Sequence, residues 1–481
     1  MFTRRKGKDM SDVSIENVNT PDGGATNKKE KTSPSLAIGY GLGEAANQMS
    51  WYMINNYLTL FYTDVVGLAG TSISLIMLIA RVWDAINDPM MGSIADKTNT
   101  RWGKFRPYLM FAPPFLAIFN ILTFTVFPVT GALKVFLCLI CYIGAGMLYT
   151  IIGTAQGALV NVIAIDSQVR MNLSTARGIG SAIISFVLSV VAMPMILMFG
   201  NAEVATAKGF FWTTVVLSAT SIPMFLAEAF LCKEKYTAKL HSTDAVKAEK
   251  KNFITQLREL IKNDQLTAIV ISTLFGSICV TARMSLLSYY LIYVVGSYQL
   301  ISVVFGVMTA AQFVGTLCIP TMTKLMGKKK YMLLLTWIMI GGFVLIYLFG
   351  AKSTPLLLVA SFICGLTNSA GALSYGFVSD SIEYGTWKTG QRQEGLAASF
   401  LSLAVKCSQA VCGVFGILLI TAFGYVAGVE QTEAAKNGIN FVVNIIPVFC
   451  GLLSILPLHW YKLTESRVAE IRADLEKRET I

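Results

Sequence analysis

Charge is scarce in this sequence of 481 residues. Asp, Glu, Lys and Arg make up 14% of the chain, whereas 54% of the residues are apolar. Ordinary soluble domains carry about 25% charged residues, which they need to cover their surface. The composition therefore argues against a soluble enzyme and against a disordered chain. It favours a helical protein that crosses the membrane several times, since each spanning helix needs about 20 mostly apolar residues.

Histidine and usable cysteine pairs are also lacking. The two histidines, His241 and His459, are too few to build a proton relay through a membrane. Nine cysteines are present, and the one C-x-x-C pair, Cys138 and Cys141, lies inside an apolar run, which is typical of a buried helix rather than a metal or redox site. No phosphate-binding loop ending in Lys-Ser or Lys-Thr occurs, so ATP-driven activity is not indicated. We therefore predict that the protein is not an enzyme and has no cofactor.

Twelve apolar segments, each long enough to span a membrane, are separated by polar loops. They are too long and continuous for the strands of a barrel, so the predicted fold class is an all-α polytopic membrane protein with twelve transmembrane helices in two six-helix halves. The segments lie near 36–62, 70–95, 107–128, 134–164, 177–200, 210–231, 266–295, 301–324, 331–350, 355–379, 396–425 and 438–461. The predicted domains are a disordered cytoplasmic tail (1–34), an N-terminal bundle (35–231), a cytoplasmic linker (232–265), a C-terminal bundle (266–462) and a cytoplasmic tail (463–481).

The basic residues gather on one predicted side of the membrane. The chain has 39 Lys and Arg and a net charge of +11. Four loop lysines fall on the opposite side and three basic residues fall inside segments, which leaves 32 on the side of the termini. The seven exceptions are Lys134, Lys208, Lys352, Lys436, Arg81, Arg283 and Lys406. By the positive-inside rule, we predict a multi-pass protein of the plasma membrane with both termini in the cytoplasm, and no nucleic-acid partner.

The second apolar segment carries four polar residues on one helix face. Arg81, Asp84, Asn87 and Asp88 are spaced i, i+3, i+6 and i+7. Two carboxylates one turn apart in a low dielectric cannot both ionise cheaply unless a cation lies between them. An ion pair with Arg81 that only holds helices together is the alternative. Because charges inside membranes are usually functional, we favour a site for Na⁺ or H⁺, with no other metal expected.

At this point the sequence resembles a known family. The run from Arg81 to Pro89, followed by Thr100-Arg-Trp-Gly-Lys-Phe-Arg-Pro107, is similar to the glycoside–pentoside–hexuronide:cation symporters, the melibiose permease group of the major facilitator superfamily. The likeness extends from about 36 to 465. Further matching motifs are Tyr40-Gly-Leu-Gly-Glu44-Ala-Ala-Asn47, Phe61-Tyr-Thr-Asp64-Val-Val-Gly, Ala176-Arg177-Gly178, Ser379-Asp380-Ser-Ile-Glu383-Tyr-Gly, Arg392-Gln-Glu394-Gly and Lys406. The resemblance implies the major facilitator fold, with a substrate site near the midplane between the halves.

The resemblance also implies roles for individual residues. It assigns cation binding to Asp84, Asn87, Asp88 and Thr150, with Lys406 close to them. It also implies that charged residues at the cytoplasmic helix ends pair to lock one conformation. The gating residues implied in this way are Asp96, Arg101, Lys104, Arg106, Asp380, Glu383, Arg392 and Glu394.

The implied sugar site departs from the melibiose permease. Asn47-Gln48 replaces a Lys-Asp pair, Gly153 replaces an Asp, and Gly157 replaces a Trp. An acid followed by Asn, as in Glu44 and Asn47, is closer to the glucuronide-type transporters of the family. The predicted substrate residues are Glu44, Asn47, Gln48, Tyr149, Arg177 and Lys406. Two roles for Arg177 stay open: pairing with a hexuronate carboxylate, or acting as a charge at a helix end.

Aromatic residues leave a further alternative open. Trp51, Tyr52, Tyr57, Tyr149 and Trp387 could stack on a sugar, although for any single one the membrane-interface belt or the core is the favoured place.

The sequence therefore predicts symport of a glycoside, pentoside or hexuronide into the cell, driven by Na⁺ or H⁺ through alternating access. We expect a monomer whose partners are the sugar and the lipid bilayer. A carrier of the same fold for a lipid-like or sulfonated substrate is the alternative, since the sugar carboxylates are missing. A channel or receptor is disfavoured, because neither needs paired carboxylates.

Overall fold

The structure is a computed structural model, and it describes residues 33–98, 100–164, 166–234, 263–390, 394–427 and 429–479. Almost all of the predicted N-terminal tail therefore lies outside the described residues. The predicted linker, 232–265, is described only at its two ends.

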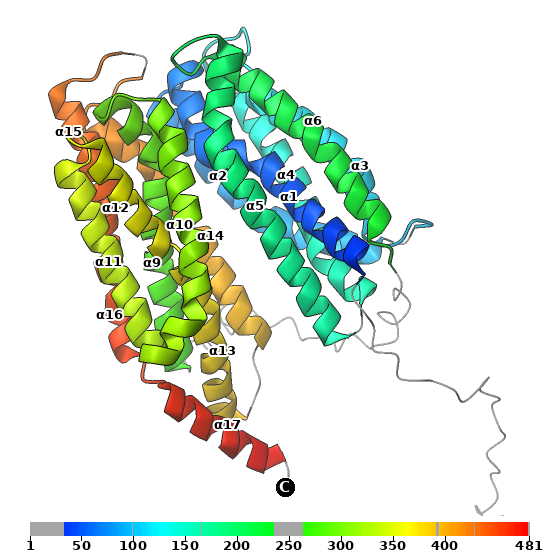
Figure 1. The fold of residues 1–481 in the computed structure, drawn as a ribbon. Helices are drawn as coiled ribbons and strands as arrows, with labels where there is room; N and C mark the ends of the chain where they lie inside the picture. Colours follow the sequence, from blue (N-terminus) through cyan, green and yellow to red (C-terminus); the bar gives the residue numbers. More distant parts are fainter. Residues whose placement is uncertain are drawn as a thin grey trace, which may run out of the picture.

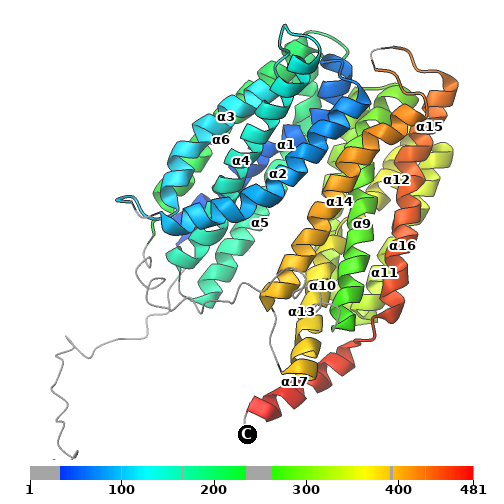
Figure 2. The same cartoon turned by 180° about the vertical axis from the view of Figure 1, so that it is seen from behind.

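Within the described residues, helices α1 to α6 form the N-terminal half and helices α9 to α16 form the bundle of the C-terminal half (Figures 1 and 2). The N-terminal helices are α1 (Pro34–Leu60), α2 (Gly70–Lys97), α3 (Arg106–Thr123), α4 (Ala132–Ile163), α5 (Ser167–Gly200) and α6 (Ala207–Leu231). The C-terminal helices are α9 (Asp264–Tyr289), α10 (Gln299–Met326), α11 (Lys328–Phe349), α12 (Thr354–Thr367), α13 (Ala370–Thr389), α14 (Glu394–Ala422), α15 (Glu433–Asn444) and α16 (Ile446–Trp460).

All twelve predicted apolar segments are helical, which confirms the all-α membrane fold. Two of them are each built from a pair of helices, α12 with α13 and α15 with α16. Within the described ranges, nine helical spans are long and apolar enough to cross a membrane. The helices α1, α2 and α3 are not among those nine, and α2 carries the charged residues singled out above. The count of twelve spans is consistent with this arrangement and stays a prediction.

The start of α5 and the predicted C-terminal tail both differ from the sequence-based expectation. Helix α5 begins at Ser167 rather than near residue 177, because the Asp166 side chain accepts a hydrogen bond from the Gln168 N–H at 2.7 Å and caps it. Arg177 therefore lies about three turns inside a helix and not at its start. A further helix, α17 (Glu465–Glu479), occupies the predicted C-terminal tail, with Val468 and Ile471 buried against the C-terminal half.

The two halves lie side by side and are not parallel. They come together at the end that carries α15 and diverge toward the end that carries α17 (Figures 1 and 2). Helix pairs α2–α14, α5–α10 and α1–α9 contact each other across the two halves. Near the closed end, Ser74 Oγ of α2 donates a hydrogen bond to the Val414 carbonyl of α14 at 2.7 Å.

The same turn ends the first helix of each half. Helix α1 continues into one turn of π-helix, η1 (Phe61–Val65), and α9 continues into η2 (Tyr290–Val294). Both turns lead into Val-Val-Gly, and the glycines, Gly67 and Gly296, adopt positive φ values of 73° and 84°. Glycine is required there, since other residues rarely adopt this conformation. The repeat makes Asp64 of η1 equivalent to Tyr293 of η2.

A second repeated device ties the last helix of each half to the third. The Glu234 carboxylate, just after α6, accepts the N–H groups of Lys104, Phe105 and Arg106 at 2.8, 2.7 and 3.0 Å. Glu465, just after α16, likewise accepts the Lys328 N–H at 2.6 Å. The free N–H groups at a helix start favour such a carboxylate. In each half, one carboxylate therefore joins the segment after the last helix to the start of the third helix.

Helices α1 and α5 approach so closely that Gly180 has no room for a side chain. A Cβ there would collide with the carbonyl oxygen of Gly41, which belongs to the backbone and cannot rotate away. We expect Gly180→Ala to lower the stability by roughly 1–3 kcal/mol through overpacking. The measurement is the thermal unfolding midpoint of the purified protein in detergent. Gly178→Ala is the control, because a Cβ on Gly178 meets nothing within 4 Å; equal midpoints for the two variants would contradict this packing.

Candidate functional site

The two carboxylates of α2 have different partners. Asp84 Oδ2 pairs with Arg81 Nη1 at 3.1 Å, one turn away on the same helix. Asp88 pairs with Lys406 Nζ of α14, which belongs to the other half. Both carboxylates are thus balanced by a cation, one from within the helix and one across the interface. A small cation that binds Asp88 would have to replace the Lys406 ammonium.

Asn87 lies between these two carboxylates in the sequence, but unlike them it has no side-chain partner among the described residues. Its side chain is fully buried, and neither amide atom has a hydrogen-bond partner among the residues that the structure describes. An unpaired buried polar group costs about 1–3 kcal/mol, so it calls for an explanation such as a bound ion or water. The fourth predicted cation residue, Thr150, is partly buried on α4, where its carbonyl accepts the Thr154 hydroxyl at 2.8 Å.

Aromatic rings connect α1 and α4 to this charged face of α2. The Trp51 ring of α1 stacks on the Tyr149 ring of α4 with 4.2 Å between centroids and 20° between planes. It also stacks on Tyr142 at 6.4 Å. The Tyr142 hydroxyl accepts a hydrogen bond from Arg81 Nη2 at 3.3 Å. Two rings, those of Trp51 and Tyr142, therefore connect Tyr149, a predicted substrate residue, to Arg81, the partner of Asp84.

Three predicted substrate residues meet between α1 and α5. Arg177 Nε donates to Glu44 Oε2 at 2.6 Å, and Gln48 Nε2 donates to Glu44 Oε1 at 3.3 Å. The depth of Arg177 inside α5 is what allows this contact. Asn47, 4% exposed, has an Oδ1 atom without a hydrogen-bond partner in the described part of the chain. Lys406, the sixth predicted substrate residue, lies at Asp88 instead of in this cluster.

One buried acidic residue was missed by the sequence analysis. Glu228 of α6 is fully buried and accepts a hydrogen bond from Gln156 Nε2 of α4 at 2.8 Å. The Gln156 carbonyl in turn accepts the Tyr40 hydroxyl at 2.9 Å. The signal was available, because Glu228 is an acidic residue inside an apolar segment, but none of the motifs named above includes it.

The predicted gating residues of the N-terminal half bond within that half. Arg106 Nε donates to the Ala229 carbonyl at 2.6 Å, and the Arg101 guanidinium lies over the Trp102 ring at 4.1 Å. The Lys104 N–H is held by Glu234, as described above. The Asp96 side chain lies outside the described residues.

The predicted gating acids of α13 also bond within their own half. Asp380 Oδ2 accepts from Lys328 Nζ at 2.6 Å, and Glu383 Oε2 accepts from Arg472 Nε of α17 at 2.6 Å. The hydrogen bond to Glu383 raises the pKa of the Arg472 guanidinium above its usual value. Arg392 lies outside the described residues, as does the side chain of Glu394, the first residue of α14.

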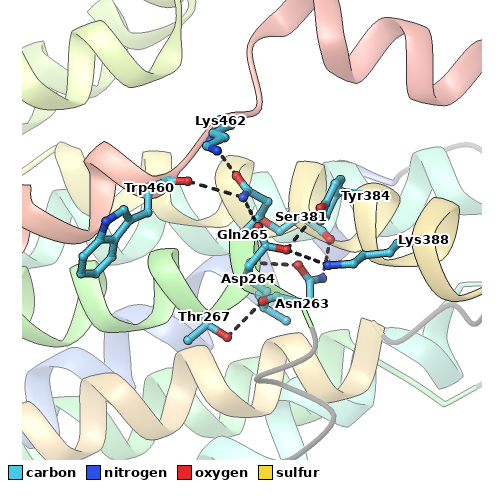
Figure 3. A network of polar contacts seen from close by, with 10 residues as sticks. Asn263, Asp264, Gln265, Thr267, Ser381, Tyr384, Lys388, Trp460 and Lys462 are labelled. Atoms are coloured by element: carbon cyan, nitrogen blue, oxygen red, sulfur yellow. Dashed lines mark hydrogen bonds and ion pairs between the residues drawn. The ribbon is translucent and has the colours of Figure 1, made fainter.

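A polar network fixes the start of the C-terminal half to α13 and to the residues after α16 (Figure 3). Asn263 Nδ2 donates to the Ser381 carbonyl at 2.8 Å, and Gln265 Oε1 accepts the Lys462 N–H at 2.7 Å. Asp264 Oδ1 accepts from Lys388 Nζ at 3.0 Å. The end of the predicted linker is therefore held to α13 and to the residues after α16, close to the gating acids.

At the closed end, Asp64 of η1 is bonded across the interface. Tyr293 of η2 donates to Asp64 Oδ2 at 2.6 Å, and Tyr425, just after α14, donates to Asp64 Oδ1. The adjacent Thr63 shares a hydrogen bond with the Tyr289 hydroxyl at 2.8 Å. Asp64 and Tyr293, equivalent positions of the two halves, thus bond to each other.

Comparison with known proteins shows which family model, relatives and solved structures this chain is similar to. Residues 39–465 match a family model described as MFS/sugar transport protein. The isoprimeverose transporter of Lactiplantibacillus pentosus is 29% identical over 456 residues, which cover 92% of this chain and 91% of that protein. The glucuronide carrier protein homolog of Escherichia coli (strain K12) is 29% identical over 450 residues, covering 92% of this chain and 96% of that protein. The crystal structure of a D-xylose-proton symporter shares the fold, with a TM-score of 0.61 and 13% identity over 87% of this chain and 96% of that one.

Proposed function

Since the chain belongs to the MFS/sugar transport protein family, we propose that it is a secondary transporter that couples Na⁺ or H⁺ entry to the uptake of a glycoside, pentoside or hexuronide. The predicted resemblance to the glycoside–pentoside–hexuronide:cation symporters is confirmed by this family match and by the relatives named above. Because those relatives are named for an isoprimeverose and a glucuronide substrate, a sugar is favoured over a lipid-like or sulfonated molecule.

The ion pair between Asp88 and Lys406 is the observation that carries this proposal, because it joins the cation residues of one half to the other half. A cation held by Asp84, Asn87, Asp88 and Thr150 displaces the Lys406 ammonium and frees the two halves to move. The sugar binds beside it, at Glu44, Asn47, Gln48, Tyr149 and Arg177. Each ligand then raises the affinity for the other, since thermodynamic coupling is reciprocal.

The arrangement of the halves supports alternating access. They diverge at the end of α17 and meet at the end of α15, as an inward-open carrier does when its termini are cytoplasmic (Figures 1 and 2). On closure of the inner end, the basic loop residues Arg101, Lys104 and Arg106 and the acids Asp380 and Glu383 exchange partners within their halves for partners across them. Asp96, Arg392 and Glu394 complete this gating set. We place the protein in the plasma membrane as a monomer.

Uptake into membrane vesicles tests the proposed function. Vesicles that contain the protein receive an imposed Na⁺ or H⁺ gradient and a panel of labelled glycosides, pentosides and hexuronides, together with a sulfonated diol and a lysolipid. We expect one sugar to accumulate above its external concentration under one of the two gradients. Accumulation of the sulfonated diol or the lysolipid alone would overturn the sugar assignment, and counterflow without a gradient would separate a carrier from a channel.

A further inference from the structure

One acidic group inside the N-terminal bundle has no part in the proposed cycle. Glu228 of α6 is fully buried, and its Oε2 accepts a hydrogen bond from Gln156 Nε2 of α4 at 2.8 Å. Its Oε1 has no hydrogen-bond partner, and no Lys or Arg forms an ion pair with it, within the part of the chain that the structure describes. An ionisable group inside a membrane is by default a candidate functional site.

Helix α1 leaves room for this carboxyl group. A Cβ on Gly43 would lie 1.9 Å from Glu228 Oε2, so a side chain at this position would displace the acid. Tyr40, about one turn earlier on α1, donates its hydroxyl to the Gln156 carbonyl at 2.9 Å and does not reach Glu228 with it. The carboxyl group is therefore enclosed by α1, α4 and α6.

A proton is the partner that the second carboxyl oxygen lacks. An ionised carboxylate that is buried without a cation is far more costly than a neutral carboxyl group. Gln156 is also buried, and its Oε1 has no donor among the described residues. A neutral carboxyl group has one O–H donor and can still accept, so it matches both sides of a carboxamide, whereas an ionised one can only accept. Both unpaired oxygens therefore find a partner if Glu228 holds a proton.

Ionisable groups face Glu228 from several neighbouring segments. Arg177 of α5 and Glu44 of α1 act on its carboxyl group electrostatically, and they pair with each other at 2.6 Å. The other ionisable groups nearby are Tyr40 of α1, Cys232 just after α6, and Arg106 of α3, which is bonded to the Ala229 carbonyl. Because the charges of Glu44 and Arg177 cancel, the proton on Glu228 decides the net charge of the cluster formed by Glu44, Arg177 and Glu228.

That net charge determines how well the cluster accepts an anion. Only Nε of Arg177 is bonded among the described residues, to Glu44, and the Arg177 side chain is 35% exposed. The remaining N–H groups of the guanidinium can thus bind the carboxylate of a sugar acid. In a low dielectric, a negative charge on Glu228 repels this carboxylate. A proton on Glu228 and an anionic sugar therefore favour each other's binding.

We propose that Glu228 is a proton-binding site of this carrier, separate from the cation site on α2, and that its proton is taken up together with an anionic sugar, a hexuronide. The proposal rests on the proposed function and chooses within its substrate class. With the proton, the occupied cluster carries one net negative charge instead of two. The proton therefore offsets the charge that the sugar brings into the membrane.

The first part of the test detects the proton. Infrared difference spectra between the purified wild type and Glu228→Gln at neutral pH should show the carbonyl stretch of a neutral carboxyl group that the variant has lost. Glu203→Gln is the control, at an exposed acid between α5 and α6, and should keep this band. Absence of the band from the wild type would overturn the proton site.

The second part measures the coupling to the sugar. Binding of methyl glucuronide and of the neutral methyl glucoside is titrated from about pH 5 to about pH 9, a range in which the glucuronide stays ionised. As Glu228 loses its proton with rising pH, the ratio of the glucuronide affinity to the glucoside affinity should fall about tenfold or more in the wild type. The ratio removes any effect of pH on the α2 site that both sugars share. In Glu228→Gln the ratio should not change with pH.

The wild-type protein separates the two levels of inference. If it accumulates no sugar under either gradient, the proposed function fails. If it accumulates a sugar, three results would each refute the proton site alone: no binding of the glucuronide at acidic pH, an affinity ratio that is independent of pH, or a pH dependence that persists in Glu228→Gln.

Discussion

Asp88→Asn is expected to abolish cation-driven accumulation while the protein still inserts and folds. The amide keeps the shape of the carboxylate but cannot balance Lys406 or hold a cation by charge. Asp84→Asn should act in the same direction, because it leaves Arg81 without its ion-pair partner. Coupling between two ligands is usually worth about 5- to 150-fold in affinity, so the loss should be visible as accumulation that falls to the level of vesicles without a gradient.

The measurement is concentrative uptake, compared with counterflow in the same vesicles. Counterflow needs no net cation movement, so it should survive better than accumulation in both variants. Glu433→Gln is the matched control, since this acid forms only a surface pair with Lys436 and has a side chain that is 84% exposed. Full concentrative uptake in both aspartate variants would refute the assignment of the cation site.

Asp64→Ala is expected to open the closed end of the carrier. The carboxylate accepts hydrogen bonds from Tyr293 and Tyr425 of the other half. Hydrogen bonds to a charged group contribute about 1.5–3 kcal/mol each, so their removal should shift the ratio of the two conformations by roughly tenfold or more. Tyr293→Phe removes one of the two bonds and should have a smaller effect in the same direction.

Spin labels placed on each side of the closed end measure this shift. Val204, after α5, and Val429, before α15, are both about half exposed and belong to different halves. We expect a longer distance between labels at these two positions to gain population in Asp64→Ala. Tyr375→Phe, at a tyrosine that is 71% exposed, is the control. An unchanged distance distribution in Asp64→Ala would show that this contact does not hold the end closed.

Much of the fold could be predicted from the sequence because its strongest signals, apolar length and helical spacing, are local. Apolar length located the twelve apolar helical segments, and the spacing of Asp84, Asn87 and Asp88 placed them on one helix face without any knowledge of tertiary structure. Apolarity was a poorer guide to boundaries. It placed the start of α5 about ten residues late, because residues 167–176 are polar, and it gave no sign of α17, whose composition is that of a surface helix.

Which side chains pair between helices that are far apart in the sequence could not be predicted from local sequence patterns. Lys406 and Asp88 are 318 positions apart, and the spacing along α2 could not tell which carboxylate the lysine would reach. The same holds for Asp64, whose tyrosine partners follow 229 and 361 positions later. Motif resemblance pointed to Asp64 but gave it no partner, and it left Trp51 among five aromatic residues without distinguishing it from the others.

Because Glu234 and Glu465 each tie the last helix of a half to its third helix, each half moves as a rigid body. If neither half can deform easily, movement is confined to rotation about the contacts near α15. Helix α2 has 28 residues, so it is about 42 Å long at roughly 1.5 Å per residue. A tilt of about 10° at one end then displaces the other by about 7 Å, wider than a sugar ring. A few hydrogen bonds near α15, where the halves meet, are therefore sufficient to control a large opening at the end that carries α17.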